Sequence, residues 1–144
     1  MNKKIGAGIL AIDKNTGKIL LCRRGMDGSY PNTWAIFGGT FEIEDGTPKQ
    51  TAKREFWEES SIIDSYIISK EPFYLNTDNF LDFYSYIGVF DGQPNVTLNE
   101  ENLDYCWVDL ENIPFNIIPG LKELLDNKKN ELKIIISKIM SSKY

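Results

Sequence analysis

The chain has 144 residues, a formal net charge of −5 and an apolar content of 42%. This length and composition fit one folded domain with its own hydrophobic core, and the negative charge argues against a broad nucleic-acid-binding surface, which requires a basic field. Histidine is absent, which excludes Ser-His-Asp and Cys-His catalysis, histidine general bases and most zinc sites.

The cysteines and the N-terminus bear on where the protein acts. Cys22 and Cys106 lie in apolar, strand-like runs without metal-ligand spacing, so we expect two buried structural thiols. The N-terminal sequence MNKKIGAGILAID lacks the apolar core and the cleavage site of a signal peptide. No run approaches the roughly 18 apolar residues of a membrane helix. We therefore expect a cytoplasmic protein in a reducing compartment.

The N-terminal residues predict a β-hairpin. Residues 5–12 and 18–23 are short apolar runs, and the polar residues 13–17 between them end in a glycine that suits a turn. Arg23 and Arg24 are adjacent cations at the end of the second run. They are either solvated surface residues, or one of them faces a phosphate group.

A glycine pair follows a third short strand. Residues 25–33 form a polar loop rich in turn formers, and residues 34–37 (WAIF) are an apolar strand that runs directly into Gly38 and Gly39. Trp34 stands at the junction of loop and strand. A tryptophan in this position is expected in the core, or stacked on a planar ligand.

A helix is predicted at about residues 47–60. Thr47 is a suitable N-cap, Pro48 suits the first helical position, and Gln50 completes a capping-box pattern with Thr47. The helix ends at Ser61 without the glycine that most easily adopts a left-handed conformation there.

Three glutamates crowd the second half of this helix. Glu55, Glu58 and Glu59 are spaced i, i+3 and i+4, which places them on one face, where like charges repel. Arg54 precedes them and has Glu58 as its i+4 partner. An acidic face of this kind is either solvated or holds a cation, and hard divalent ions such as Mg²⁺ prefer carboxylate oxygens.

The next part of the chain predicts further strands. Residues 62–75 are an apolar-rich strand region broken by Pro72, and residues 79–90 are a long aromatic strand. A polar loop with three acidic residues follows at 96–104, and residues 105–108 form a short buried strand.

The C-terminal region is predicted to be helical. Its apolar residues follow helical spacing, which is typical of a face packed on the core; docking of a partner helix is the alternative. The order of strands, helix, strands and terminal helix predicts a mixed α/β fold in one domain over residues 1–144. The apolar stripe consists of Leu121, Leu124, Leu125, Leu132, Ile135, Ile136, Ile139 and Met140.

The glycine pair, the acidic loop, the helix start and the glutamates form one motif. In this order they resemble the signature of the Nudix hydrolases. The order of hairpin, Trp-strand-Gly-Gly and a late WVDL segment before a proline also agrees. The second half of the signature is matched by Arg54, Glu55, Phe56, Glu58, Glu59 and Ile62.

One departure from the motif concerns the arginine. Counted back from Arg54, the motif's isolated glutamate falls on Gly46. In the family this carboxylate commonly braces the motif arginine, so Glu44 or Asp45 is expected to replace it from the loop.

Two further positions depart from the motif. Its glycine falls on Thr40, which implies one inserted residue if Gly39 is the counterpart. The glycine after the glutamate pair is Ser61, which should strain the exit of the helix at a modest cost. Neither departure touches the three helical glutamates.

The resemblance implies a Nudix-like α/β/α sandwich with a mixed β-sheet and a metal-dependent enzyme. The Gly39 carbonyl with Glu55, Glu58 and Glu59 would hold Mg²⁺ or Mn²⁺ that bridges a diphosphate. Arg54 would orient a carboxylate, and Glu58 is the first choice for the general base.

Other residues are candidates for further roles in such a site. Acids of the late loop are either alternative bases or solvated charges: Glu100, Glu101 and Asp104. Candidates for substrate contact, through phosphate pairing or stacking, are Arg23, Arg24, Trp34 and Tyr105.

The leading function hypothesis is hydrolysis of the diphosphate linkage of a nucleoside diphosphate derivative, by attack of water on phosphorus. A modified nucleoside triphosphate, an ADP-ribose-type nucleotide sugar and a dinucleoside polyphosphate are the substrate alternatives. A non-catalytic nucleotide sensor and a structural interaction domain are the competing hypotheses. The expected partner is a nucleotide-type small molecule, without a membrane or polymeric nucleic acid, and the chain is either a monomer or a homodimer.

Overall fold

Strand β1 (Lys4–Asp13) is the centre of a mixed β-sheet in the structure, a computed structural model that describes residues 3–142. On one side β1 runs parallel to β7 (Leu81–Phe90) along its full length. On its other side it pairs antiparallel first with β4 (Phe37–Thr40) and then, at Ile12, with β2 (Ile19–Arg24). The predicted hairpin is therefore confirmed, although β2 leaves β1 after this single pair.

The remaining strands extend the sheet outward on both sides, and all of them pair antiparallel. β3 (Trp34–Ala35) and β8 (Asn102–Val108) pair with β2. β5 (Ile67–Ile68) and β6 (Tyr74–Thr77) pair with β7.

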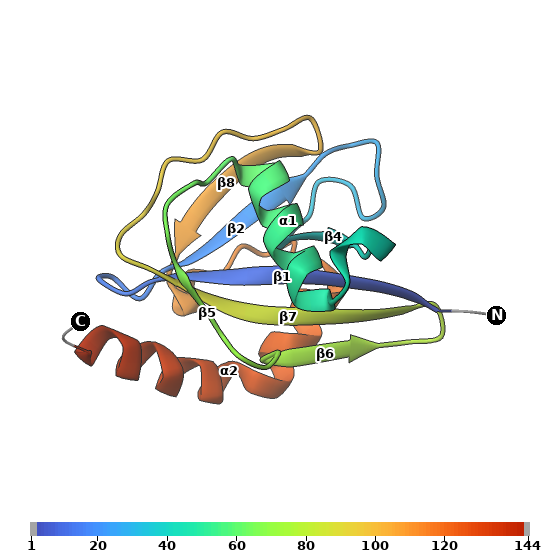
Figure 1. The fold of residues 1–144 in the computed structure, drawn as a ribbon. Coiled ribbons are helices and arrows are strands. Elements are labelled where there is room, and N and C mark those ends of the chain that lie inside the picture. The colour runs from blue at the N-terminus through green and yellow to red at the C-terminus, as the bar shows by residue number, and fades with distance from the viewer. Residues whose placement is uncertain (1–2, 143–144) are drawn as a thin grey trace.

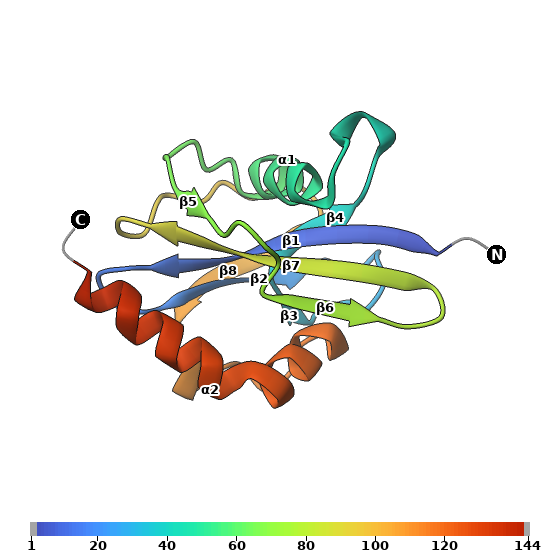
Figure 2. The same ribbon diagram turned by 60° about the horizontal axis from the view of Figure 1, so that its bottom comes forward.

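One helix covers each face of the sheet. Figure 2 shows α1 (Pro48–Ser60) on one face and α2 (Pro119–Ser141) on the other, and Figure 1 shows α1 lying across β1 and β4. Two short 3₁₀ turns, Ile43–Asp45 and Leu110–Asn112, precede the helices. The predicted α/β/α sandwich with a mixed sheet is confirmed.

The central strand is buried on both faces. Ala7, Ile9 and Ala11 contribute to the core under α1, whereas Leu10 and Ile12 contribute to the core under α2. Successive strand side chains point to opposite faces, so a strand covered on both sides is a continuous apolar run, as residues 5–12 are.

Helix α1 is anchored in the core by Phe56. The Phe56 ring packs edge-to-face on Phe37, with centroids 5.9 Å apart, and stacks on Phe90 at 5.6 Å. Tyr66 completes the cluster, with its ring 5.7 Å from Phe56. These contacts set the side of α1 that faces the sheet.

The ends of α1 match the predicted signals. The Thr47 hydroxyl accepts the Gln50 N–H at 3.2 Å, and Pro48 is the first helical residue. Ser61 adopts a left-handed conformation with φ 59° and donates its N–H to the Trp57 carbonyl. Serine therefore occupies the position that suits glycine, at a cost of about 1–2 kcal/mol.

Helix α2 packs its apolar stripe on the opposite face of the sheet. Leu121, Leu124, Leu125, Leu132 and Ile136 are buried, which confirms core packing for these positions. The apolar side chains of α2 are less buried toward its C-terminus. Met140, which lies beside the turn at Gly17, is 46% exposed.

Three predicted strands have different bounds in the structure. Residues 34–37 are divided at Ile36, because β3 pairs with β2 whereas β4 pairs with β1. Within residues 62–75 only the two short strands β5 and the start of β6 form, since Pro72 has no N–H to donate. β8 begins at Asn102, so Asp104 belongs to a strand and not to the preceding loop.

Both cysteines are free thiols. Cys22 is buried, as predicted, whereas Cys106 is only half-buried, and burial raises the pKa of both thiols. Within residues 3–142, no helix is both long enough and apolar enough to cross a membrane.

Truncation of the α2 stripe should destabilise the fold. Leu132 is fully buried, so Leu132→Ala is expected to lower the free energy of unfolding by about 2–5 kcal/mol through lost burial and the cavity left behind. Ile134, on the same helix, is 56% exposed, and Ile134→Ala should change it by less than about 1 kcal/mol. Urea denaturation measures both values, and equal losses would contradict the packing of α2.

Candidate functional site

Arg54 connects the loop before α1 to the glutamates of the helix. Its Nε and Nη2 atoms donate to the two carboxylate oxygens of Asp45 at 2.7 and 3.0 Å, a bidentate pair. Nη2 also donates to the Thr40 carbonyl at 3.0 Å. Nη1 donates to Glu55 at 2.9 Å and to Glu58 at 3.1 Å. One side chain therefore holds the end of β4, the loop and two helical carboxylates together.

Asp45 supplies the carboxylate that the motif places at Gly46. The 3₁₀ turn of Ile43–Asp45 accommodates the inserted residue, and Gly46 follows it with a positive φ of 79°. Asp45 also accepts the Glu42 N–H at 2.9 Å and the Thr51 hydroxyl at 2.8 Å. Of the two predicted replacements, Asp45 contacts Arg54 and Glu44 does not.

The environment of Asp45 favours its charged form. Its side chain is only 5% exposed, and hydrogen bonds from the Arg54 guanidinium hold the pKa of this carboxyl well below its usual range. Asp45 is therefore ionised throughout the neutral and mildly acidic range.

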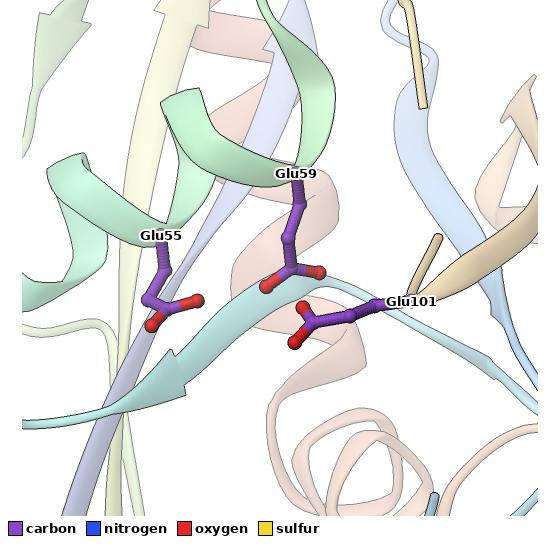
Figure 3. Close-up of side chains that lie close together, drawn as sticks. All are labelled: Glu55, Glu59 and Glu101. Carbon is purple, nitrogen blue, oxygen red and sulfur yellow. The ribbon is translucent and has the colours of Figure 1, made fainter. Parts of the chain in front are cut away.

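Three carboxylates converge beside Arg54. Oxygen atoms of Glu55, Glu59 and Glu101 all lie within 4.8 Å of one another, and Figure 3 shows the Glu59 and Glu101 side chains pointing toward each other. Glu55 and Glu59 come from successive turns of α1, and Glu101 comes from the residue before β8. We call these three residues the carboxylate cluster.

Glu59 is the buried member of the carboxylate cluster. It is 5% exposed, and its Oε1 accepts the Asn102 side-chain N–H at 2.9 Å. Burial raises the pKa of Glu59 to about 9, with a further contribution from neighbouring Glu55. A carboxyl with this pKa holds a proton at neutral pH unless a cation replaces that proton.

Gly39 brings the backbone of β4 against the carboxylate cluster. A Cβ atom at this position would lie 2.3 Å from the Glu55 carboxylate carbon, so no other residue fits without displacing Glu55. Gly39 was predicted as a metal ligand through its carbonyl oxygen, and the close approach to Glu55 is compatible with that prediction.

Glu58 lies outside the carboxylate cluster. Its carboxylate pairs with Arg54 and its side chain is 44% exposed. Seen down the axis of α1, the side chain of Glu59 (i+4) projects in nearly the same direction as that of Glu55 (i). The side chain of Glu58 (i+3) projects to the other side of Glu55. The ion pair with Arg54 holds the Glu58 side chain on that other side, away from Glu59. The structure therefore brings together two of the three predicted helical glutamates, Glu55 and Glu59, and adds Glu101.

The late loop is held to α1 by the Thr97 N–H, which donates to the Ser60 carbonyl at 2.9 Å, and to the end of β2 through Glu101. The Glu101 carbonyl accepts the Gly25 N–H at 2.9 Å, and its N–H donates to Asn99 at 3.1 Å. Of the other candidate bases, Glu100 is exposed, and Asp104 accepts the Tyr105 N–H at 2.8 Å. Sequence reasoning missed Asn102, because an asparagine without a motif gives no signal of its partner.

A cavity of about 270 Å³ lies on the α2 face of the sheet. Arg24 is among its lining residues; Arg23, Trp34 and Tyr105 are not. Arg23 donates to Asn32 at 2.7 Å and Trp34 packs on the core under α2, whereas Tyr105 is 37% exposed on β8. Of the four predicted substrate contacts, only Arg24 therefore lies at this cavity.

The arrangement suits a hard divalent cation. Mg²⁺ and Mn²⁺ take carboxylate and carbonyl oxygens, and three carboxylates this close repel one another without a positive charge. The site combines such oxygens with an arginine whose charge pH does not remove.

Loss of the Asp45 carboxylate should destabilise the protein in a pH-dependent way. The folded-state pKa of Asp45 is depressed, so its stabilising contribution is present above the ordinary carboxyl pKa of about 3.9 and is lost as pH falls toward the folded value. The Tm of Asp45→Ala should lie below that of the wild type at pH 7, and the gap should narrow below about pH 4. Thermal melts with Glu44→Ala as the control measure this, and a gap that is independent of pH would contradict it.

Comparisons with known proteins show the family of the chain. A family model described as the NUDIX domain matches residues 2–128. The chain is 32% identical over 118 residues to the dihydroneopterin triphosphate diphosphatase of Haemophilus influenzae, covering 82% of this chain and 68% of that protein.

Solved structures have the same fold. A Nudix hydrolase from M. smegmatis, RenU, superposes with a TM-score of 0.77 at 18% identity, covering 90% of this chain and 86% of that one. A C. elegans Ap4A hydrolase gives a TM-score of 0.72 at 19% identity, covering 90% and 98%. The family model, the curated relative and the motif held together by Arg54 lead to one conclusion: the chain belongs to the Nudix hydrolase family.

Proposed function

We propose that this Nudix pyrophosphohydrolase uses Mg²⁺ or Mn²⁺, held by the carboxylate cluster, to hydrolyse the diphosphate linkage of a nucleoside diphosphate derivative. The observation that carries the proposal is the convergence of Glu55, Glu59 and Glu101 within 4.8 Å, with Glu59 buried. The Gly39 carbonyl is the additional ligand in this proposal, because the backbone of β4 lies against Glu55. The proposal treats residues 1–144 as a single domain.

The chemistry of the residues fits this reaction. Phosphoryl transfer needs positioning and neutralisation of the charge that develops on the phosphoryl oxygens, and a divalent cation supplies most of that neutralisation. The protein's part is to fix the carboxylates: Arg54 orients Glu55, and Asn102 orients Glu59. Glu101 closes the cluster from the late loop.

Glu58 is the general base in this proposal. Its carboxylate stays outside the carboxylate cluster, on the same stretch of α1, and it is partly exposed to water. A base must reach the proton of the attacking water, and a carboxylate that holds no cation is free to accept it. Arg54 positions this carboxylate as well.

The substrate alternatives follow the related proteins. The curated relative is named for dihydroneopterin triphosphate and the C. elegans protein for Ap4A. A triphosphate and a dinucleoside polyphosphate are therefore the first substrates in the proposal, and an ADP-ribose-type nucleotide sugar is the third. A cytoplasmic site of action is also proposed, where the free thiols of Cys22 and Cys106 stay reduced.

Hydrolysis should depend on the carboxylate cluster. With Mg²⁺ at millimolar concentration, the wild type is expected to release products from at least one of dihydroneopterin triphosphate, Ap4A and ADP-ribose. Glu59→Gln and Glu58→Gln should each lower kcat/KM by about 100-fold or more, because each removes a carboxylate that the reaction uses. Glu44→Gln, in the loop, is the control and should retain activity. Absence of turnover across the panel would contradict the proposal, and nucleotide binding without turnover would favour a sensor.

The metal-free protein should lose stability as pH rises. The pKa of Glu59 is about 9 in the folded state, against 4.5 for an ordinary glutamate carboxyl in water. Between these values the folded protein retains a proton that the unfolded chain has released, so the free energy of unfolding falls with increasing pH. Urea denaturation in EDTA should show this fall for the wild type and for Glu58→Gln, but not for Glu59→Gln. Addition of Mg²⁺ at pH 8 should restore stability to the wild type; a flat wild-type profile would contradict the burial of Glu59.

A further inference from the structure

Two members of the carboxylate cluster are held by a side-chain donor, and the third is not. Arg54 donates to Glu55, and the Asn102 side chain donates to Glu59. Among the described residues no donor contacts the Glu101 carboxylate. This carboxylate nevertheless points toward Glu59 (Figure 3), and charged carboxylates at such distances repel one another. The position of Glu101 must therefore be set through its backbone.

Both backbone groups of Glu101 are hydrogen-bonded. Its N–H donates to Oδ1 of the Asn99 side chain at 3.1 Å, and its carbonyl accepts the Gly25 N–H at 2.9 Å. A Cβ atom at Gly25 would lie 3.1 Å from the Glu101 carbonyl oxygen, so a side chain there would crowd this bond. Of the two contacts, only the one with Asn99 uses a side chain, so a substitution can remove it and leave the backbone unchanged.

Asn99 begins a tight turn that brings two residues to the site. The Asn102 N–H donates to the Asn99 carbonyl at 3.4 Å, so residues 99–102 form a β-turn with Glu101 as a central residue. Asparagine is favoured at the first position of such turns, because its side chain accepts the N–H two residues further on. The last residue of the turn, Asn102, is the partner of Glu59. One turn therefore supplies a carboxylate of the cluster and the donor to the buried carboxylate.

The chain on either side of this turn is fixed to the fold. Before the turn, Val96 and Leu98 pack against the core under α1, and the Thr97 N–H donates to the Ser60 carbonyl at 2.9 Å. After the turn, β8 pairs with β2. With both ends held, the conformation of the turn itself decides where the Glu101 side chain points, and the Asn99 side chain bonds inside that turn.

We propose that Asn99 is the positioning residue for Glu101: its side chain fixes the turn that presents the Glu101 carboxylate to the metal site. The inference rests on the metal-dependent hydrolysis proposed above. Asn99 acts through the N–H of Glu101 and binds neither metal nor substrate. It thereby does for the third carboxylate of the cluster what side-chain donors do for the other two. Without this bond the turn relaxes, the carboxylate moves away from its two neighbours, and the cation binds more weakly.

Metal binding by the protein alone measures this role. In titrations with Mn²⁺ in the absence of substrate, with free Mn²⁺ followed by electron paramagnetic resonance, Asn99→Ala should raise the Kd about three- to tenfold, as expected for one lost hydrogen bond. Asn99→Ser keeps an oxygen acceptor that forms the same turn more weakly, so its Kd should lie between those of the wild type and Asn99→Ala. In a Glu101→Gln background, Asn99→Ala should change the Kd less than about twofold, because the carboxylate that it positions is gone.

The matched control is Asp78→Ala. Asp78 Oδ1 accepts the Phe80 N–H at 2.7 Å in the turn between β6 and β7, a contact of the same kind outside the carboxylate cluster. Its loss should lower the Tm but leave the Kd for Mn²⁺ unchanged. The positioning role would be overturned by an unchanged Kd in Asn99→Ala, by a Kd of Asn99→Ser as high as that of Asn99→Ala, or by an undiminished effect of Asn99→Ala in the Glu101→Gln background.

Hydrolysis with Mg²⁺ is scored separately from metal binding. Turnover by a protein whose affinity for Mn²⁺ does not depend on Asn99 overturns only the positioning role. Binding of Mn²⁺ that depends on Asn99, without turnover of any substrate, overturns only the proposed hydrolysis. A wild-type protein that binds no Mn²⁺ overturns both.

Discussion

The site depends on the hydrogen bonds of one guanidinium group. Arg54 binds Asp45 with two nitrogen atoms, and its other hydrogen bonds reach Glu55, Glu58 and the Thr40 carbonyl. A lysine has three donors on one atom and could not span this set, whereas the planar guanidinium can. Because the group stays charged at any pH the fold survives, the end of β4, the loop and the helix remain joined while the carboxylates around them titrate.

Sequence reasoning succeeded where the signal is local. The N-cap at Thr47, the first-turn proline and the apolar strand at residues 5–12 are predicted from neighbouring residues, and the structure confirms all three. Sequence reasoning could not predict which side chains contact each other when the two residues are separated along the chain. Glu44 and Asp45 are adjacent carboxylates, and only the turn ending at Gly46 decides that Asp45 faces Arg54.

The same limit explains the composition of the carboxylate cluster. Spacing along α1 places three glutamates near one face, but it does not say that Arg54 holds Glu58 apart. Glu101 could be named only as an acid of a late loop, because its position depends on the pairing of β8 with β2. The cavity could not be predicted from the sequence for a related reason. Residues of β4, β6, β7 and α2 line it, and these elements are far apart in the chain.

The contact between Glu59 and Asn102 has a consequence for how the molecule folds. These residues are 43 positions apart, and contacts of such long range form slowly because a large loop must close first. α1 and its capping residues can form early from local interactions. The acidic groups of α1 meet Glu101 and Asn102 only once β8 has joined the sheet. The repulsion that Glu101 adds to the helical glutamates thus arises only at a late stage of folding, when the sheet is already in place to hold these side chains.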